Sequence, residues 1–148
     1  MSLKQQLSDD IKQAMRGGDK LRLKTLRMVS AAIKQREVDE RIELDDSAVL
    51  AVLEKMIKQR RESAEQYHQG QRPELAEIEE AEIKVLSVYL PEPLGSEELD
   101  ALIDQAIAQQ DAVGMAAMGA VMATLKDQVQ GRADMRDVSA RVRARLAG

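Results

Sequence analysis

The feature that most constrains this chain is the stretch Lys55–Pro91, whose pattern predicts two long helices folded back on each other. The turn is expected at Gly70–Pro73, because glycine commonly ends a helix and proline commonly opens one. At 3.6 residues per turn, each predicted helix carries an apolar stripe along one side. Two such stripes are expected to pack against each other in an antiparallel hairpin.

Polar residues interrupt both apolar stripes of this hairpin. Arg60 and Ser63 fall in the first stripe, and Glu79 and Glu82 fall in the second. The hairpin register places Arg60 opposite Glu82 and Ser63 near Glu79, while Tyr67 offers a hydroxyl to the same group. A buried arginine without a partner is costly, so we infer ion pairs across the hairpin. The five residues are predicted to form a structural ion-pair network.

Two interpretations of this network are open. Buried ion pairs can fix how two helices slide past each other without adding much stability. Alternatively, clustered charges with perturbed ionisation can mark a catalytic or metal site. We adopt the structural interpretation, because such charges also occur in networks without chemistry.

Composition narrows the class of protein. The chain has 148 residues and no cysteine, which excludes disulfides, thiol nucleophiles and thiolate metal sites. The first ten residues contain no apolar segment typical of a signal peptide, and no apolar run reaches the roughly 20 residues that span a membrane. We therefore expect no membrane contact and a cytoplasmic location.

Charge is dense and almost balanced, with 22 basic and 26 acidic residues and a net charge of −4. A free-standing nucleic-acid binder usually has a clear basic excess. The predicted helix at residues 20–38 nevertheless carries a basic face of Lys20, Lys24, Arg27 and Lys34. This face is either simply solvated or a strip that contacts phosphates.

Aromatic residues are almost absent, since Tyr67 and Tyr89 are the only two. Proteins that read single-stranded RNA mostly stack its bases on aromatic side chains. Two tyrosines that both fall on apolar stripes cannot build such a platform. Any contact with RNA is therefore expected to go to its backbone and shape.

Helical periodicity without any strand pattern predicts an all-α fold in two domains. A bundle of about four helices, including the long hairpin, is expected at residues 1–90, and a small three-helix domain is expected at residues 96–148. The segment Pro91–Gly95 should break the helix and mark the boundary. Gly119 lies inside a helical pattern, which predicts that another backbone approaches it closely.

Motifs for common chemistry are missing. No phosphate-binding loop, nucleophile elbow or zinc-protease motif occurs. Glu65 and His68 match half of a di-iron site, but a full site needs a second such motif, and His68 is the only histidine. We therefore expect no catalytic residue, no metal and no cofactor.

The hairpin carries a distinctive set of residues, namely Lys58–Ser63, Tyr67, Gly70, Arg72, Glu74, Leu75, Glu79, Glu82 and Tyr89–Pro91. Leu26 with Arg27, and the segment Met118–Asp134, add to this pattern. With these residues the sequence resembles the YqeY family along nearly its whole length. The chain departs from the family at Ala120, where the family has lysine, which removes one candidate phosphate contact.

The resemblance implies a helical N-terminal bundle and a three-helix tail similar to the C-terminal region of the tRNA-dependent amidotransferase B subunit. In those settings the tail contacts tRNA and carries no chemistry. Family members are commonly labelled carbon–nitrogen ligases with glutamine as amide donor. That label fits the full subunit better, because this chain has no kinase or transamidase domain.

These observations lead to a non-catalytic tRNA-binding accessory protein as the main hypothesis, binding weakly when alone. The predicted nucleic-acid contacts are Lys126, Arg132, Arg136, Arg141 and Arg143, assisted by Lys24 and Arg27. A protein-interaction adaptor for an aminoacyl-tRNA synthetase or amidotransferase is one alternative. A true glutamine-dependent ligase is the other, although no nucleotide site is evident. The sequence leaves the oligomeric state open.

Overall fold

A computed structural model describes residues 1–148 and shows only helices, which confirms the all-α prediction. The chain divides into two compact units, Met1–Leu90 and Pro91–Gly148. The first unit contains α1 (Leu3–Gly17), α2 (Lys20–Glu40), α3 (Asp46–Gln69) and α4 (Pro73–Ser87). The second contains α5 (Ser96–Ala108), the short 3-10 helix η1 (Gly114–Ala117), α6 (Met118–Val129) and α7 (Met135–Ala147).

Side-chain caps begin four of these helices. The side chains of Ser2, Asp19, Asp45 and Asp134 each accept a hydrogen bond from a backbone N–H in the first turn of the helix that follows. Such caps satisfy donors that have no partner inside the helix. Gly18 ends α1 with a φ of 70°, a left-handed conformation that glycine adopts without strain. The sequence therefore determines where most of the helices start.

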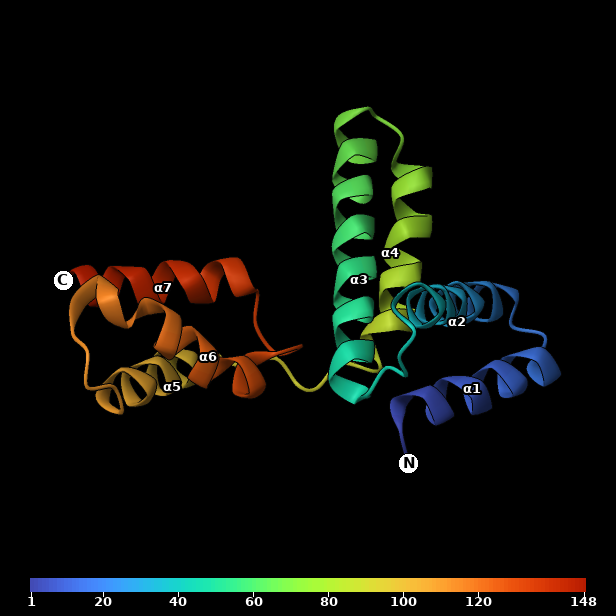
Figure 1. The fold of residues 1–148 in the computed structure, drawn as a ribbon. Helices are drawn as coiled ribbons and strands as arrows, with labels where there is room; N and C mark the ends of the chain where they lie inside the picture. The colour runs from blue at the N-terminus through green and yellow to red at the C-terminus, as the bar shows by residue number, and fades with distance from the viewer. The chain divides into compact units, whose positions relative to one another are not determined.

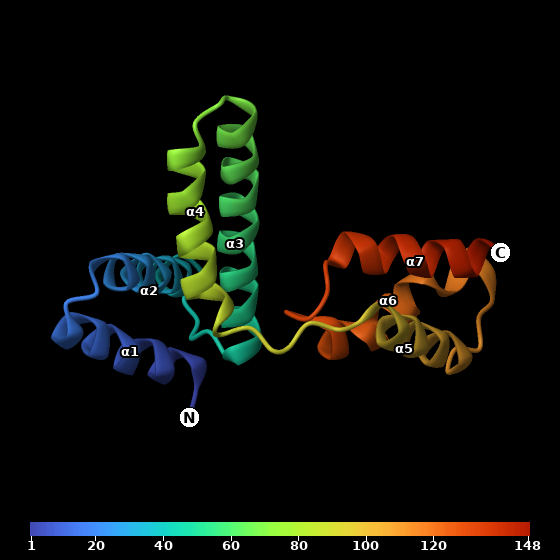
Figure 2. The same ribbon diagram turned by 180° about the vertical axis from the view of Figure 1, so that it is seen from behind.

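Helices α3 and α4 run side by side in opposite directions and form the long hairpin of the first unit (Figures 1 and 2). Gln71 has a φ of 60° in the turn that joins them. Helix α2 crosses the lower half of this hairpin and contacts both of its helices, while α1 packs on α2. The upper half of the hairpin extends beyond α2.

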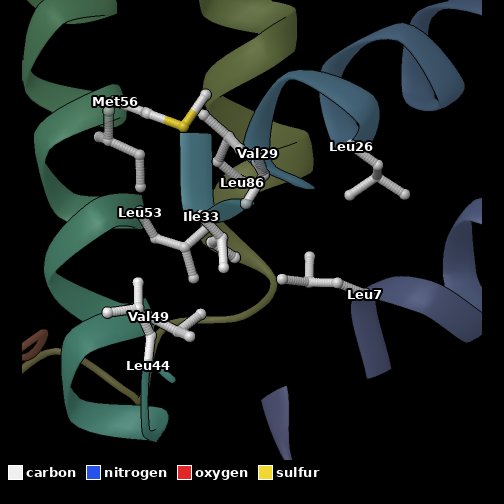
Figure 3. Close-up of a cluster of buried hydrophobic side chains, with 10 residues drawn as sticks. Leu7, Leu26, Val29, Ile33, Leu44, Val49, Leu53, Met56 and Leu86 are labelled. Carbon is white, nitrogen blue, oxygen red and sulfur yellow. The ribbon is translucent and has the colours of Figure 1, made fainter. Parts of the chain in front are cut away.

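The core of the first unit lies where these four helices meet. Figure 3 shows Leu7 of α1, Val29 and Ile33 of α2 and Leu53 of α3 directed toward the same space. Leu86 of α4 joins this cluster and is fully buried. Burial of such apolar side chains supplies most of the stabilisation of a helical unit, because each isolated helix is marginal in water.

Polar contacts hold α1 onto the rest of the first unit. Lys4 Nζ lies 2.7 Å from Glu37 Oε2, and the same carboxylate accepts a bond of 2.8 Å from the Leu44 backbone. The hydrogen bond and charge of Lys4, with that backbone donor, lower the pKa of Glu37 below its usual value. Tyr89 donates its hydroxyl hydrogen to Asp10 of α1, across 79 positions of sequence.

The second unit has its own core, formed by residues such as Leu99, Val121, Leu125 and Val138 from three helices. The short helix η1 precedes α6, which becomes a regular α-helix at Met118. The prediction for Gly119 was wrong, because a β-carbon there would have no atom within 4 Å and the residue is exposed. None of the helices is long and apolar enough to span a membrane.

Tyr89 provides a pH test of this packing. Burial raises the pKa of Tyr89 above its usual range, and the hydrogen bond and charge of Asp10 add to this effect. Since the folded-state pKa exceeds the unfolded value of about 10, the neutral phenol stabilises the fold below that pH. That contribution is lost as the pH rises through the folded-state pKa.

We predict that in a Tyr67→Phe variant, where Tyr89 is the only tyrosine, the phenol ionises well above pH 10 and together with alkaline unfolding. Ultraviolet absorbance and circular dichroism, followed in one titration, measure the two events. The companion variant Tyr89→Phe should lose about 1–2 kcal/mol of stability at neutral pH, because Asp10 loses its donor. Ionisation near pH 10 in a chain that is still folded would contradict the prediction.

Candidate functional site

Arg60 is the buried charge at the centre of the first unit. It lies on the inner side of α3, 7 % exposed, because the apolar period of that helix turns it toward α4 and α2. Its Nε atom donates to Glu82 Oε2 at 2.9 Å, and Nη1 donates to the backbone oxygen of Met56 at 3.1 Å. Nη2 lies 3.6 Å from the sulfur of Met28 on α2. The guanidinium therefore contacts three helices.

Glu82 is the anionic partner and is only 5 % exposed. Its Oε2 atom accepts from Arg60, while its Oε1 atom lies 4.0 Å from the Lys24 ammonium of α2. Lys24 is exposed, so the carboxylate lies between a buried cation and a solvated one. The arrangement neutralises both buried charges, as a buried ion pair must.

The structure places the rest of the predicted network differently. Ser63, Tyr67 and Glu79 are half-buried, but none of them is a partner of Arg60. The donors of the guanidinium are taken by Glu82, the Met56 carbonyl and the Met28 sulfur. Sequence spacing missed Met28 and Lys24 because both come from α2, which lies outside the hairpin pattern.

No arrangement for acid–base or nucleophilic chemistry surrounds this pair. His68 Nε2 lies 2.9 Å from Glu80 Oε1, and both side chains are exposed near the tip of the hairpin. His68 thus pairs with Glu80 rather than with Glu65 of the predicted half motif. No group of three or more histidine and carboxylate side chains is positioned to hold a metal ion. The Arg60–Glu82 contact is a buried ion pair between α3 and α4.

The basic face of α2 lies at the surface, as its sequence pattern indicates. Lys20, Lys24, Arg27 and Lys34 are all exposed. The first three of them line an open hollow of about 430 Å³. The same hollow is lined by Leu23, Met28 and Ala31, so its floor is apolar.

Two of the five predicted tail contacts are engaged inside the second unit. Arg141 Nη1 donates to Asp100 Oδ1 at 3.0 Å and to the Ser96 hydroxyl at 3.0 Å, and its Nε donates to Asp137 at 3.1 Å. The hydrogen bonds that Arg141 donates to the carboxylates of Asp100 and Asp137 raise its pKa. Arg132 Nε donates to the backbone oxygen of Glu92 at 2.8 Å. Arg141 thus joins α7 to α5. Arg132, between α6 and α7, holds the Pro91–Gly95 segment.

The remaining tail cations face solvent. Lys126 of α6 and Arg136 and Arg143 of α7 are exposed, and their side chains form no ion pair. Arg136 and Arg143 are seven residues apart and so share one side of α7, about 10 Å from each other along its axis. Ala120, where the resembling family has lysine, is exposed on α6.

The ion pairs between α5 and α7 could have been predicted from the spacing of acidic and basic residues in the sequence. Asp100 and Asp104 are four residues apart on α5, and Arg141 and Arg145 are four residues apart on α7. Arg145 pairs with Asp104, and its Nη2 lies 3.4 Å from Asp100. Residues four apart lie on the same helix face, so two matched pairs predict a ladder between two helices.

The profile of the family described as Yqey-like protein matches residues 4–146, nearly the entire chain. The chain belongs to the YqeY family. The resemblance inferred from the hairpin and tail motifs is thereby confirmed, whereas contact with tRNA remains a prediction.

Several curated relatives share one name, "Altered inheritance of mitochondria protein 41, mitochondrial". The relative from Lachancea thermotolerans is 36 % identical over 106 residues, which is 70 % of this chain and 57 % of that protein. The relative from Pyrenophora tritici-repentis is 32 % identical over 129 residues, covering 86 % of this chain and 71 % of that protein. The relative from Kluyveromyces lactis is 38 % identical over 102 residues, or 67 % and 55 % of the two chains. This YqeY-family chain thus spans about half to seven tenths of these relatives.

These names contradict the cytoplasmic location expected from the sequence, since the relatives are named as mitochondrial proteins. The expectation rested on the lack of a secretory signal and of a membrane-spanning segment. Those features bear on secretion and membrane insertion only. They do not distinguish one aqueous compartment of a cell from another, so the inference was wrong.

For the buried pair, we predict that Arg60→Ala lowers the free energy of unfolding by about 3 kcal/mol or more, because Glu82 is left without its buried partner. Urea denaturation measures the change. The neighbouring Arg61→Ala is the matched control, since Arg61 is exposed and should change stability by less than about 0.5 kcal/mol.

The double variant Arg60→Met with Glu82→Leu should recover most of the lost stability, because neither buried charge remains. Equal effects of Arg60→Ala and Arg61→Ala would show that Arg60 does not lock the helices.

Proposed function

We propose that this YqeY-family chain is a non-catalytic RNA-binding accessory protein whose preferred RNA is tRNA. The observation that carries the proposal is the division of the α7 arginines between two sides of the helix. Arg141 and Arg145 are bound by acids of α5, whereas Arg136 and Arg143 extend from the other side into solvent without ion pairs. Cations that are not neutralised within the fold remain available for phosphates.

The proposed contact is with the RNA backbone. Arg side chains form bidentate hydrogen bonds with phosphate, and the release of counterions favours such binding. Arg136 and Arg143 are the primary contacts, and Lys126 of α6 adds a third exposed cation in the same unit. Arg132 and Arg141 are left out of this set, because their guanidinium groups already bind acceptors in the tail.

Recognition of stacked bases does not suit this chain. Tyr89 donates its hydroxyl to Asp10, Tyr67 is half-buried against the hairpin, and the sequence has no other aromatic residue. A folded RNA whose backbone has a distinctive shape suits a site with cations and no stacking platform. This is the physical support for tRNA over an unstructured single strand.

A non-catalytic role is supported by the state of the candidate chemical groups. The buried Arg60–Glu82 pair satisfies its own charges, and His68 pairs with a surface glutamate. The similarity to the tail of the amidotransferase B subunit supports the same role, because that region contacts tRNA without carrying the reaction. The ligase label of the family belongs, in this proposal, to proteins that include the catalytic domains.

We predict that replacing Arg136 and Arg143 together with glutamine weakens tRNA binding and flattens its salt dependence. Two lost phosphate contacts should reduce the slope of log K against log salt by about 1.4–1.8. Fluorescence anisotropy with labelled tRNA, repeated over a series of salt concentrations, measures both effects.

The matched control replaces Arg16 and Arg61 with glutamine, which removes the same charge from exposed arginines of the first unit. That variant should keep the slope of the unmodified chain. The proposal fails if the two variants behave alike, or if the unmodified chain shows no preference for tRNA over duplex DNA of equal length at low salt.

A further inference from the structure

Helix α2 presents apolar side chains on two sides. One side, with Leu26, Val29 and Ile33, is buried in the core of the first unit. The other side is at the surface, where Leu23, Met28 and Ala31 line the hollow of about 430 Å³. Met28 is 41 % exposed and lies at the surface of the hollow.

Three cations lie on the same face of α2 as Leu23 and Met28. Lys20, Lys24 and Arg27 line the same hollow and are exposed. Lys24 has an acidic neighbour at 4.0 Å, but that neighbour, Glu82, is already held by Arg60 at 2.9 Å. From Arg16 to Arg36, Asp19 is the single acid, so the surface has a strong local excess of positive charge.

The residues that line the hollow follow one helical face. They are Lys20, Leu23, Lys24, Arg27, Met28 and Ala31. Their spacing of i, i+3, i+4, i+7, i+8 and i+11 is the stripe with which one helix packs along another. The stripe covers eleven steps of about 1.5 Å, or about 16 Å, which equals about three helical turns. These residues therefore form one continuous face of α2 about three turns long.

We propose that this face of α2 binds an amphipathic helix of a partner protein, in which leucine- or methionine-like side chains lie between rows of Asp and Glu. The apolar side chains of the partner would enter the hollow over Leu23, Met28 and Ala31. Its acids would pair with Lys20, Lys24 and Arg27, which lie among these apolar side chains. Amphipathic helices commonly bind grooves through apolar anchors at this spacing.

The apolar floor distinguishes this partner from a phosphate backbone. A phosphate chain would pair with the cations but would leave Leu23, Met28 and Ala31 without apolar contacts. Methionine is flexible and polarisable, so Met28 can adapt to different apolar anchors. The contact of Arg60 with the Met28 sulfur, at 3.6 Å, supports the floor from below. The surface thus differs in chemistry from the exposed arginines of α7.

The inference goes beyond the proposed function and rests on other residues. RNA binding is assigned to Lys126, Arg136 and Arg143 of the second unit, and helix binding is assigned to α2 of the first. Either assignment can therefore fail while the other holds.

The test uses the whole chain and two labelled synthetic peptides of 18 residues with identical composition. One places leucines at helical spacing between rows of glutamate, and the other scrambles the order so that no apolar stripe forms. Fluorescence anisotropy should show that the amphipathic peptide binds about tenfold more tightly than the scrambled one. Equal binding of the two peptides would mean attraction by charge alone and would overturn the proposal.

Two substitutions locate the binding. Met28→Asp and, separately, Ala31→Glu should each weaken the amphipathic peptide about tenfold, because a carboxylate enters the apolar floor and repels the acidic rows. Ala31→Glu leaves the Arg60–Met28 contact intact, and circular dichroism verifies that both variants fold. The matched control Met15→Asp changes a methionine of α1 that is 53 % exposed and should bind like the unmodified chain. Equal losses in control and test variants would refute the site.

Two other occupants are separate outcomes of the same experiment. Displacement of the peptide by tRNA, together with loss of tRNA binding in Ala31→Glu, would assign the surface to RNA and overturn the inference. Sedimentation at micromolar concentration tests whether a second copy of this chain occupies the surface. A dimer of the unmodified chain that Ala31→Glu converts to a monomer would assign the surface to a second copy of this chain.

Discussion

The Arg60 guanidinium is the constraint on which the first unit depends. Packed apolar side chains tolerate small sliding movements between helices, whereas a buried charge must keep its partner within hydrogen-bond distance. Arg60 meets this condition with bonds to Glu82 on α4 and to the Met56 carbonyl on its own helix, and with a contact to Met28 on α2. One side chain thus joins α3 to α4 and contacts α2 where it crosses the hairpin. The buried residues Leu26, Val29 and Ile33 form the side of α2 that faces the core.

The sequence was sufficient for the fold class and for the central pair, and insufficient for the remainder of the network. The helical period of 3.6 residues places Arg60 and Glu82 on the facing stripes of the two helices. This placement depends only on the spacing of residues within each helix. Spacing cannot tell which of several polar residues on adjacent turns comes closest, so Glu79, Ser63 and Tyr67 were included although Arg60 contacts none of them. The bond from Tyr89 to Asp10 joins residues 79 positions apart, and only the packing of α1 on the bundle creates it.

In the second unit too, spacing within one helix does not predict contacts with a neighbouring helix. Counting arginines on α7 predicts a basic surface, but exposure of a charge depends on what the neighbouring helix offers. Asp100 and Asp104 on α5 bind Arg141 and Arg145, which leaves Arg136 and Arg143 as the two α7 arginines without an ion pair. Gly119 shows that a small residue is equally ambiguous. Its place inside a helical pattern predicts a close backbone contact, but a β-carbon there would have no atom within 4 Å. The role of an arginine or a glycine on a helix can be assigned only when the neighbouring helices are known.

The distribution of acids explains why a chain with a net charge of −4 still carries two cationic surfaces. Carboxylates on α1, α4 and α5 are used to hold helices together, as in the bonds of Asp10, Glu82 and Asp100. Glu82 and Asp100 each neutralise a cation within the fold, Arg60 and Arg141, while other cations remain at the surface. The two groups of surface cations differ in their neighbouring side chains. Those of α2 lie among apolar side chains, which suits an acidic helix with apolar anchors. Those of α7 extend from a polar helix face, which suits phosphate. Charge alone would make the two surfaces equivalent, and the side chains between the charges make them different.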